Sequence, residues 1–281
     1  MAESSGRAMR VMSIMAHQDD FEFNAGGTFA LLRQTYGDGV DLRILATTRG
    51  ASGHHEMSIE ETFRRRDAEA RASAAVIGAE YECLTCLDGS HLHGQLFIDR
   101  NVCGGLWNAI RRYEPDVVFC PPVASDPLAG IHIDHENTAR AIRMVAYQLI
   151  VPNAFPTMDG PVKKRFRQPV IINVDDGYSA EGLFHIRQDI TDAYDKKCQM
   201  SLCHESQVFE WLPWTRGHEQ PLTRQQWEEH FEARHQRTNA RYEQTDGKLS
   251  EYFRVTRWAR KPEAGELERI FPKMLVNQYE G

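Results

Sequence analysis

The chain has 281 residues, of which 41% are hydrophobic, which is enough to bury the core of one large domain or of one domain with an appendage. Its 33 Lys and Arg against 40 Asp and Glu give a formal net charge of −7, which weighs against a nucleic-acid-binding protein, because such proteins cluster cations against phosphates. No apolar run approaches the roughly 20 residues of a membrane helix, and residues 1–10 lack the hydrophobic segment of a signal peptide, so we expect a cytoplasmic protein without a membrane span.

Strands and helices alternate along the first half of the chain. The apolar run at 11–16 predicts a strand, and the same periodicity rules predict, in order, helix 28–36, strand 40–47, helix 58–77, strand 81–84, helix 100–113, strand 117–120 and helix 134–149. This alternation predicts an α/β fold with a Rossmann-like, mostly parallel sheet and helices on both of its faces. Ligands of such sheets bind beyond the carboxyl ends of the strands.

The second half of the chain has a looser pattern. After a proline-rich stretch we expect strand 170–174, helix 190–203, helix 223–241 and strand 251–258. We divide the chain into a core at 1–207 and a C-terminal α+β extension at 208–281 that packs on it. The extension is rich in tryptophan, and we expect it to form either a lid over the ligand cleft or a contact between identical subunits of a homo-oligomer.

The six cysteines are too few for a disulfide scaffold, so we expect reduced thiols. Cys83 and Cys86 form a C-x-x-C pair, but no second such pair and no downstream H-x-x-x-H completes a zinc finger. This incomplete pattern weighs against a metal or redox site there.

Two clusters of polar residues follow predicted strands. Residues 16–20 read Ala-His-Gln-Asp-Asp at the end of the first strand, and residues 132–135 read His-Ile-Asp-His after the fourth. Either cluster alone is more typical of a solvated turn, a helix cap or a surface helix. The expected fold, however, brings both loops to the carboxyl edge of the sheet. One His and one Asp from the first loop and one His from the second would give zinc three ligands and leave a position for water.

These motifs resemble the signature loops of the PIG-L/LmbE-like zinc-dependent N-deacetylases, AH[P]DD and H[P]DH. The resemblance extends to about Gln207, through residues 66–69 and 76–79, 110–111 and 115–118, and 189–191, 197 and 204–207. Several ordered motifs that agree along the chain make a chance match improbable. The resemblance implies a metal-dependent amide hydrolase of the same α/β fold.

The resemblance also implies roles for the six residues of the two loops. The zinc ligands would be His17, Asp20 and His135, with Fe²⁺ or another divalent metal as an alternative ion, since such ligand sets accept several metals. The general base would be Asp19. His132 would be the cationic partner of the tetrahedral intermediate, and Asp134 would orient it and raise the pKa of its imidazole.

The chain departs from the family pattern at three positions. Gln18 and Ile133 stand where the family usually has proline, so the restriction that proline places on the preceding histidine is absent. The turn at 47–53 resembles the family's T-x-G-E-x-G motif, but Ala51 replaces its acid. The conformation of these loops is therefore less well predicted than the ligands.

Three further residues are candidates for binding the substrate. By resemblance, Arg66 would hold polar oxygens of the substrate, although an ordinary helix ion pair is as good an interpretation. Asp88 would lie at the rim of the site, or would simply belong to an Asp-Gly turn. His204 would shape the site from a neighbouring helix, or would pack or cap.

The sequence thus predicts a hydrolase that removes an acetyl or other small acyl group from an N-acetylglucosamine-like amino sugar, a small molecule, or from its conjugate. An amidase for bulkier amides and a non-catalytic metal- or sugar-binding relative are the alternatives. A nucleotide-binding domain has little support, because Asn-Ala-Gly-Gly at 24–27 is not the G-x-G-x-x-G motif.

Overall fold

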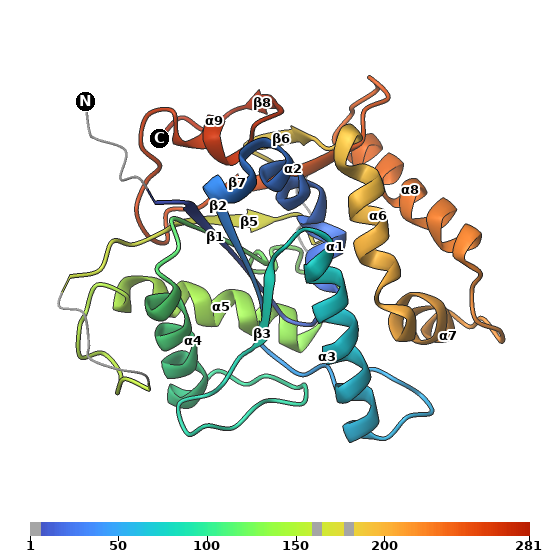
Figure 1. Ribbon diagram of the computed structural model, residues 1–281, viewed down its shortest axis with the longest axis horizontal. Coiled ribbons are helices and arrows are strands. Elements are labelled where there is room, and N and C mark those ends of the chain that lie inside the picture. The colour runs from blue at the N-terminus through green and yellow to red at the C-terminus, as the bar shows by residue number, and fades with distance from the viewer. Residues whose placement is uncertain (1–6, 159–164, 177–182) are drawn as a thin grey trace.

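The computed structural model describes residues 7–158, 165–176 and 183–281, which form an eight-stranded sheet in the order β3-β2-β1-β4-β5-β7-β6-β8 (Figure 1). Five of its strands are parallel to one another: β1 (Met9–Met15), β2 (Val40–Ala46), β3 (Glu80–Cys83), β4 (Val117–Cys120) and β5 (Val170–Val174). The expected α/β fold with a mostly parallel sheet is confirmed.

The remaining three strands add antiparallel pairs to one side of this sheet. β7 (Ser250–Val255) pairs with both β5 and β6 (Ile186–Asp189), and β8 (Met274–Asn277) pairs with β6. The sequence predicted β7 but neither β6 nor β8. Each of these two has only four residues, which is too short for a period-two alternation to stand out.

Helices cover both faces of the sheet, as expected. One face carries α2 (Gly26–Tyr36), α3 (Ile59–Val76), α6 (Tyr194–Leu202) and the short α9 (Glu266–Ile270), and the other carries α4 (Arg100–Tyr113) and α5 (Ile133–Gln148). The central strand β1 contributes side chains to the hydrophobic cores on both faces, because successive side chains of a strand point to opposite faces. Its Val11 and Met15 pack into the first core and its Met12 and Ile14 into the second.

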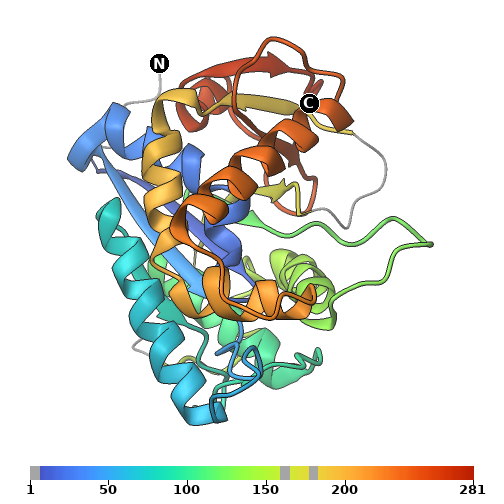
Figure 2. The same cartoon turned by 90° about the vertical axis from the view of Figure 1, so that its right-hand side faces the viewer.

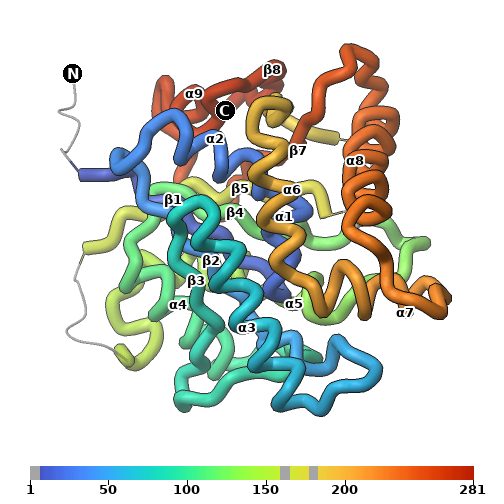
Figure 3. Tube along the Cα trace, turned by 45° about the vertical axis from the view of Figure 1, so that its right-hand side comes forward, coloured from blue at the N-terminus to red at the C-terminus, as the bar shows by residue number. Residues whose placement is uncertain are grey.

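A third, smaller group of elements lies along one side of the molecule (Figure 3). The short α1 (Asp20–Asn24) follows the first motif, while a π-helical segment (Ser206–Trp211) leads into α7 (Leu212–Thr215), and α8 (Arg224–Arg241) follows. Buried Trp227 and Phe231 on α8 pack against Cys198 of α6 and Val208 of the π-helical segment. Helix α8 therefore packs against α6 and the π-helical segment through an apolar contact.

A buried carboxylate on β7 ties this late strand to the start of the chain. Glu251 accepts hydrogen bonds from the backbone N–H groups of Gly27 and Thr28 at 2.9 and 2.8 Å, and from the Thr28 hydroxyl at 2.6 Å. It also pairs with buried Lys197 of α6 at 2.7 Å. An anion at the first turn of α2 satisfies helix N–H groups that have no partner within the helix.

All six cysteines are free thiols. Burial raises the pKa of the Cys83 thiol to about 12, so this C-x-x-C pair lacks a readily formed thiolate. None of the helices within the described residues is long and apolar enough to cross a membrane.

Candidate metal centre

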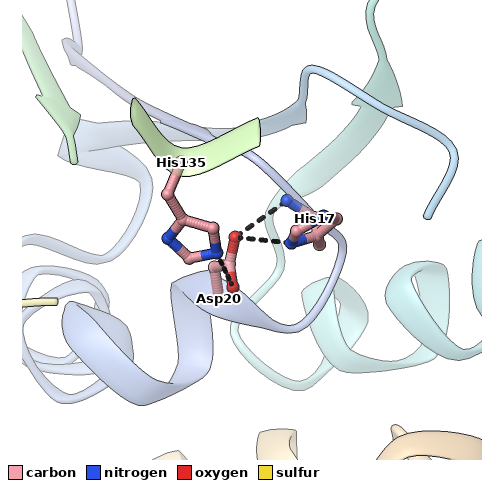
Figure 4. Close-up of side chains that lie close together, drawn as sticks. All are labelled: His17, Asp20 and His135. Atoms are coloured by element: carbon pink, nitrogen blue, oxygen red, sulfur yellow. Dashed lines mark hydrogen bonds and ion pairs between the residues drawn. The ribbon is translucent and has the colours of Figure 1, made fainter. Parts of the chain in front are cut away.

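Both signature loops lie at the carboxyl edge of the sheet. The first follows β1, and the second leads into α5, whose N-cap is His132. Because β1 and β4 are neighbouring parallel strands, the chain segments that follow them leave the sheet at the same edge. The fold thereby brings His17, Asp20 and His135 together (Figure 4).

The donor atoms of these three residues all lie within 4.8 Å of one another. The Asp20 carboxylate is central: one oxygen is 3.5 Å from His17 Nδ1, and the other is 3.3 Å from His135 Nε2. Ligands about 2.0–2.2 Å from a tetrahedral ion lie roughly 3.3–3.5 Å from each other. Two imidazole nitrogens and one carboxylate at this spacing therefore fit a zinc ion or a similar divalent metal.

Electrostatics at this cluster also favour a cation. Burial by itself would lower the pKa of His17 and of His135, but attraction to Asp20 and hydrogen bonds to carboxylates outweigh it, so the pKa of His17 is raised and that of His135 is raised well above its usual value. Burial would raise the pKa of Asp20, yet the two imidazoles hold it well below its usual range. The carboxylates therefore favour positive charge at this point, and a divalent ion would supply it.

Each of the two histidines has a second carboxylate partner. His17 Nε2 lies 3.0 Å from Asp134 Oδ2, and His135 Nδ1 lies 3.4 Å from Asp176 Oδ2. Carboxylates on the outer nitrogen of a metal-binding imidazole fix its ring orientation and increase its basicity. Sequence reasoning missed Asp176. The signal was present, because Asp175-Asp176 directly follows buried β5, and a pair of aspartates also occurs in the loop that follows β1.

The structure differs from the expectation that Asp134 orients His132. The Asp134 carboxylate binds His17 and accepts a hydrogen bond from the Leu96 N–H at 2.6 Å, while His132 Nδ1 accepts from the Asp134 backbone N–H at 3.2 Å. Burial and the charges of His17 and His135 lower the pKa of His132 by more than Asp134 raises it. His132 nevertheless lines the cavity and forms a second close group with His17 and Asp134.

Asp19 is held by Arg66 rather than exposed as a free carboxylate. The Arg66 side chain is buried and donates to Asp19 Oδ1 at 2.6 Å and to the Gly50 carbonyl at 2.8 Å. Gly50 has φ +54°, and a Cβ there would collide with the Arg66 guanidinium, so glycine is required on both counts. Arg66 thus orients a neighbouring site residue. It also lines the cavity, and its direct contact with substrate stays a prediction.

The other two substrate-binding candidates do not line the cavity. Asp88 is exposed in a turn, where its carboxylate accepts from the Ser90 N–H at 2.9 Å. His204 is fully buried, with its Nε2 at 2.9 Å from Glu22 Oε1. The turn and packing interpretations therefore fit these two residues better than substrate contact.

A cavity of about 560 Å³ opens above the cluster of His17, Asp20 and His135. One part of its lining comes from the signature loops and from loops 50–53 and 93–95. Another part comes from the region after 207, whose helices α7 and α8 lie in front of this edge of the sheet in Figure 2. That second part of the lining consists of Trp211, Leu212, Arg216, Trp227, His230, Phe231, Arg234 and Arg237.

Residues 12–146 match the model of the PIG-L family, described as GlcNAc-PI de-N-acetylase. This stretch contains both signature loops, so the resemblance seen in the motifs is confirmed. A search of the curated proteins gave no match.

Solved structures share the fold over nearly the whole chain. The N,N'-diacetylchitobiose deacetylase of Pyrococcus horikoshii has a TM-score of 0.70 at 22% identity, over 89% of this chain and 85% of that one. The 4-carboxy-2-hydroxymuconate hydratase of Pseudomonas putida KT2440 has 0.62 at 20%, over 91% and 98%. A zinc-inhibited form of teicoplanin deacetylase has 0.52 at 13%, over 89% and 99%. Since the fold carries both deacetylases and a hydratase, function has to be argued from the site.

Proposed function

We propose that this protein is a metal-dependent hydrolase that removes an acetyl group from the nitrogen of an N-acetylglucosamine-like amino sugar or of its conjugate. The observation that carries the proposal is the convergence of His17, Asp20 and His135 on one point, with Asp19 held beside them in the same cavity. The family description and the deacetylases among the structural neighbours support the reaction class.

In this proposal His17, Asp20 and His135 hold the metal. When bound, a divalent ion lowers the pKa of a coordinated water towards about 7 and polarises an amide carbonyl. Asp19 accepts the proton of the attacking water, and Arg66 keeps the Asp19 carboxylate in place through their 2.6 Å ion pair.

His132 is the proposed donor to the reacting amide. Its Nδ1 accepts a hydrogen bond from the backbone, so a proton on this neutral ring resides on Nε2. From the cavity wall this N–H can donate to the developing oxyanion. The proton that Asp19 takes from the attacking water is then delivered to the departing nitrogen, so the neutral imidazole keeps its own proton. The resemblance had suggested a cationic His132. The lowered pKa favours a neutral ring that donates from Nε2.

Zinc is the proposed native metal. Two nitrogens and one carboxylate oxygen suit its coordination chemistry. Iron(II) and other divalent ions accept the same ligands, so metal content has to be measured together with activity.

The test combines elemental analysis of the purified protein with acetate release from a panel of N-acetylated amino sugars, with and without a chelator. We expect about one divalent metal per chain and chelator-sensitive acetate release. The Asp19→Asn variant should keep its metal and lose at least about 100-fold in kcat. Metal without acetate release would point to the amidase or the binding protein, and a protein that binds no divalent metal would contradict the proposal.

A further inference from the structure

One face of α8 presents basic side chains to the cavity that contains the metal centre. His230, Arg234 and Arg237 are spaced i, i+4 and i+7, so they lie on the same side of the helix, and all three line the cavity. Arg216, which follows α7, lines the same wall. These four residues, the basic wall, lie outside the region that matches the PIG-L family.

The arginines of the basic wall lack carboxylate partners within the described residues. Arg216 donates to His230 Nε2 at 2.8 Å, and Arg234 donates to the Asn24 side-chain oxygen at 2.9 Å. Arg237 forms no ion pair within those residues either. By contrast, Arg241, one turn further along α8, lies 3.3 Å from an oxygen of Asp175.

Other features show that the positive charges of this wall are poorly compensated. Arg234 is largely desolvated above the ring of Phe23, with its guanidinium carbon 5.6 Å from the ring centre. Burial and the neighbouring cations Arg216, Arg237 and Arg234 lower the pKa of His230. Asp175 and Asp176 attract Arg234 only at longer range. Cations gathered in this way favour binding of an anion.

The charge of the whole lining agrees with this. The described lining has four arginines and four aspartates: Arg66, Arg216, Arg234, Arg237, Asp19, Asp20, Asp134 and Asp176. A divalent ion bound by Asp20 and the two histidines would leave the cavity with an excess of two positive charges. This excess is local, because the chain as a whole carries −7.

We propose that the basic wall binds an anionic group of the substrate, a carboxylate or a phosphate, while the amide of the same molecule reaches the metal centre. Arginine suits this task because its planar guanidinium binds such oxygens in a bidentate way. The inference rests on the proposed deacetylase function and narrows its substrate to acidic N-acyl compounds. Trp211 and Trp227 supply apolar lining in the same cavity.

The experiment compares the metal-loaded protein on neutral N-acetylglucosamine, on its 6-phosphate and on N-acetylmuramic acid, which carries a carboxylate. We expect kcat/KM for one or both acidic sugars to exceed that for the neutral sugar by about tenfold or more at low salt. The two acidic arms distinguish phosphate from carboxylate. High salt should reduce the preference, because it screens the charges of the exposed Arg216 and Arg237.

Variants of the basic wall test whether these residues cause the preference for acidic sugars. The Arg234→Gln and the Arg216→Gln/Arg237→Gln proteins should lose most of it through a higher KM for the acidic sugars, with kcat on the neutral sugar and metal content retained. The double variant changes only exposed side chains, so its folding is secure. Arg224→Gln is the matched control, since Arg224 lies on α8 but pairs with Glu228 at 2.8 Å outside the cavity.

The outcomes separate this inference from the function on which it rests. Equal kcat/KM for neutral and acidic sugars, or equal losses for both in the variants, would overturn the anion site while leaving deacetylation intact. If no sugar is hydrolysed, calorimetric titration of the metal-loaded protein with the same three sugars decides. Tighter binding of the acidic sugars that the wall variants lose would support the site and contradict deacetylation, and equal binding would overturn the site.

Discussion

At the scale of single residues, four carboxylates at the candidate metal centre each contact a different partner. Asp20 faces both imidazoles, whereas Asp134 and Asp176 approach the outer nitrogens of His17 and His135. Asp19 is paired instead with Arg66. The sequence identified Asp19, Asp20 and Asp134 by type and spacing, but not Asp176. It could not identify their partners, because a motif fixes neither a rotamer nor the neighbours that a side chain meets.

Removal of Asp176 tests its role as a partner of His135. We expect Asp176→Ala to weaken zinc affinity by about 10- to 100-fold, since the imidazole loses the group that orients it. Competition with a chromophoric chelator measures this affinity. Asp175→Ala is the matched control, because Asp175 pairs with Arg241 instead. Equal affinities for both variants would show that Asp176 does not support the metal.

Replacement of Arg66 tests whether it positions Asp19. Arg66→Ala leaves a buried carboxylate without its ion pair, so we expect kcat to fall by roughly 100-fold while KM and metal content change little. Arg66→Lys, which keeps the charge, should recover part of kcat. A rise in KM at constant kcat would instead indicate that Arg66 touches the substrate, as the sequence had suggested.

At the scale of elements, helix α8 and strand β7 are joined by a hydrogen bond between buried polar groups. His235 on α8 is 4% exposed, and its Nδ1 lies 3.2 Å from the Ser250 carbonyl of β7. Burial and the nearby cations Lys197 and Arg234 hold the pKa of His235 well below its usual value. The folded protein therefore keeps this imidazole neutral.

A pH dependence of stability follows from that lowered pKa. Above a pH of about 6.5 the His235 ring is neutral in both the folded and the unfolded protein. Below that pH the ring takes up a proton in the unfolded chain but stays neutral in the folded protein, because its pKa is lowered there. His235 should therefore cost up to about 1.4 kcal/mol of stability per pH unit as the pH falls below 6.5. Urea unfolding at pH 7.5 and 5.5 measures the effect. His235→Gln should reduce the loss, exposed His218→Gln should not, and equal losses in all three proteins would contradict it.

At the scale of the whole molecule, the region after 207 completes the sheet as well as the cavity. β6 lies between β7 and β8 in the sheet, and both of these strands come from the region after 207. Its Phe253, Val255 and Phe271 belong to the same hydrophobic core as Val11 and Met15 of β1. The division into a core at 1–207 and an extension stays a prediction, and the shared sheet argues that the two fold together.

Truncation tests that dependence. A chain ending at 207 would leave β6 without a paired neighbour and the start of α2 without Glu251, so we expect it to lack near-UV circular dichroism and a cooperative thermal transition. A chain lacking only the exposed residues 280–281 should unfold like the full protein. Cooperative unfolding of the 1–207 chain would establish an independent core.

The sequence by itself determined the alternation of strands and helices and the type of residue at the metal centre, because both are written in short-range periodicity and in motifs of four or five residues. Only the tertiary structure decided that Asp134 contacts His17 and that Asp176 contacts His135. It also decided that Arg66 pairs with Asp19 and that α8 lines the cavity. These contacts join residues 41 to 117 positions apart, or elements from the two ends of the chain. The physical reason is that such pairs form through the packing of the sheet and its helices, which local sequence patterns do not encode.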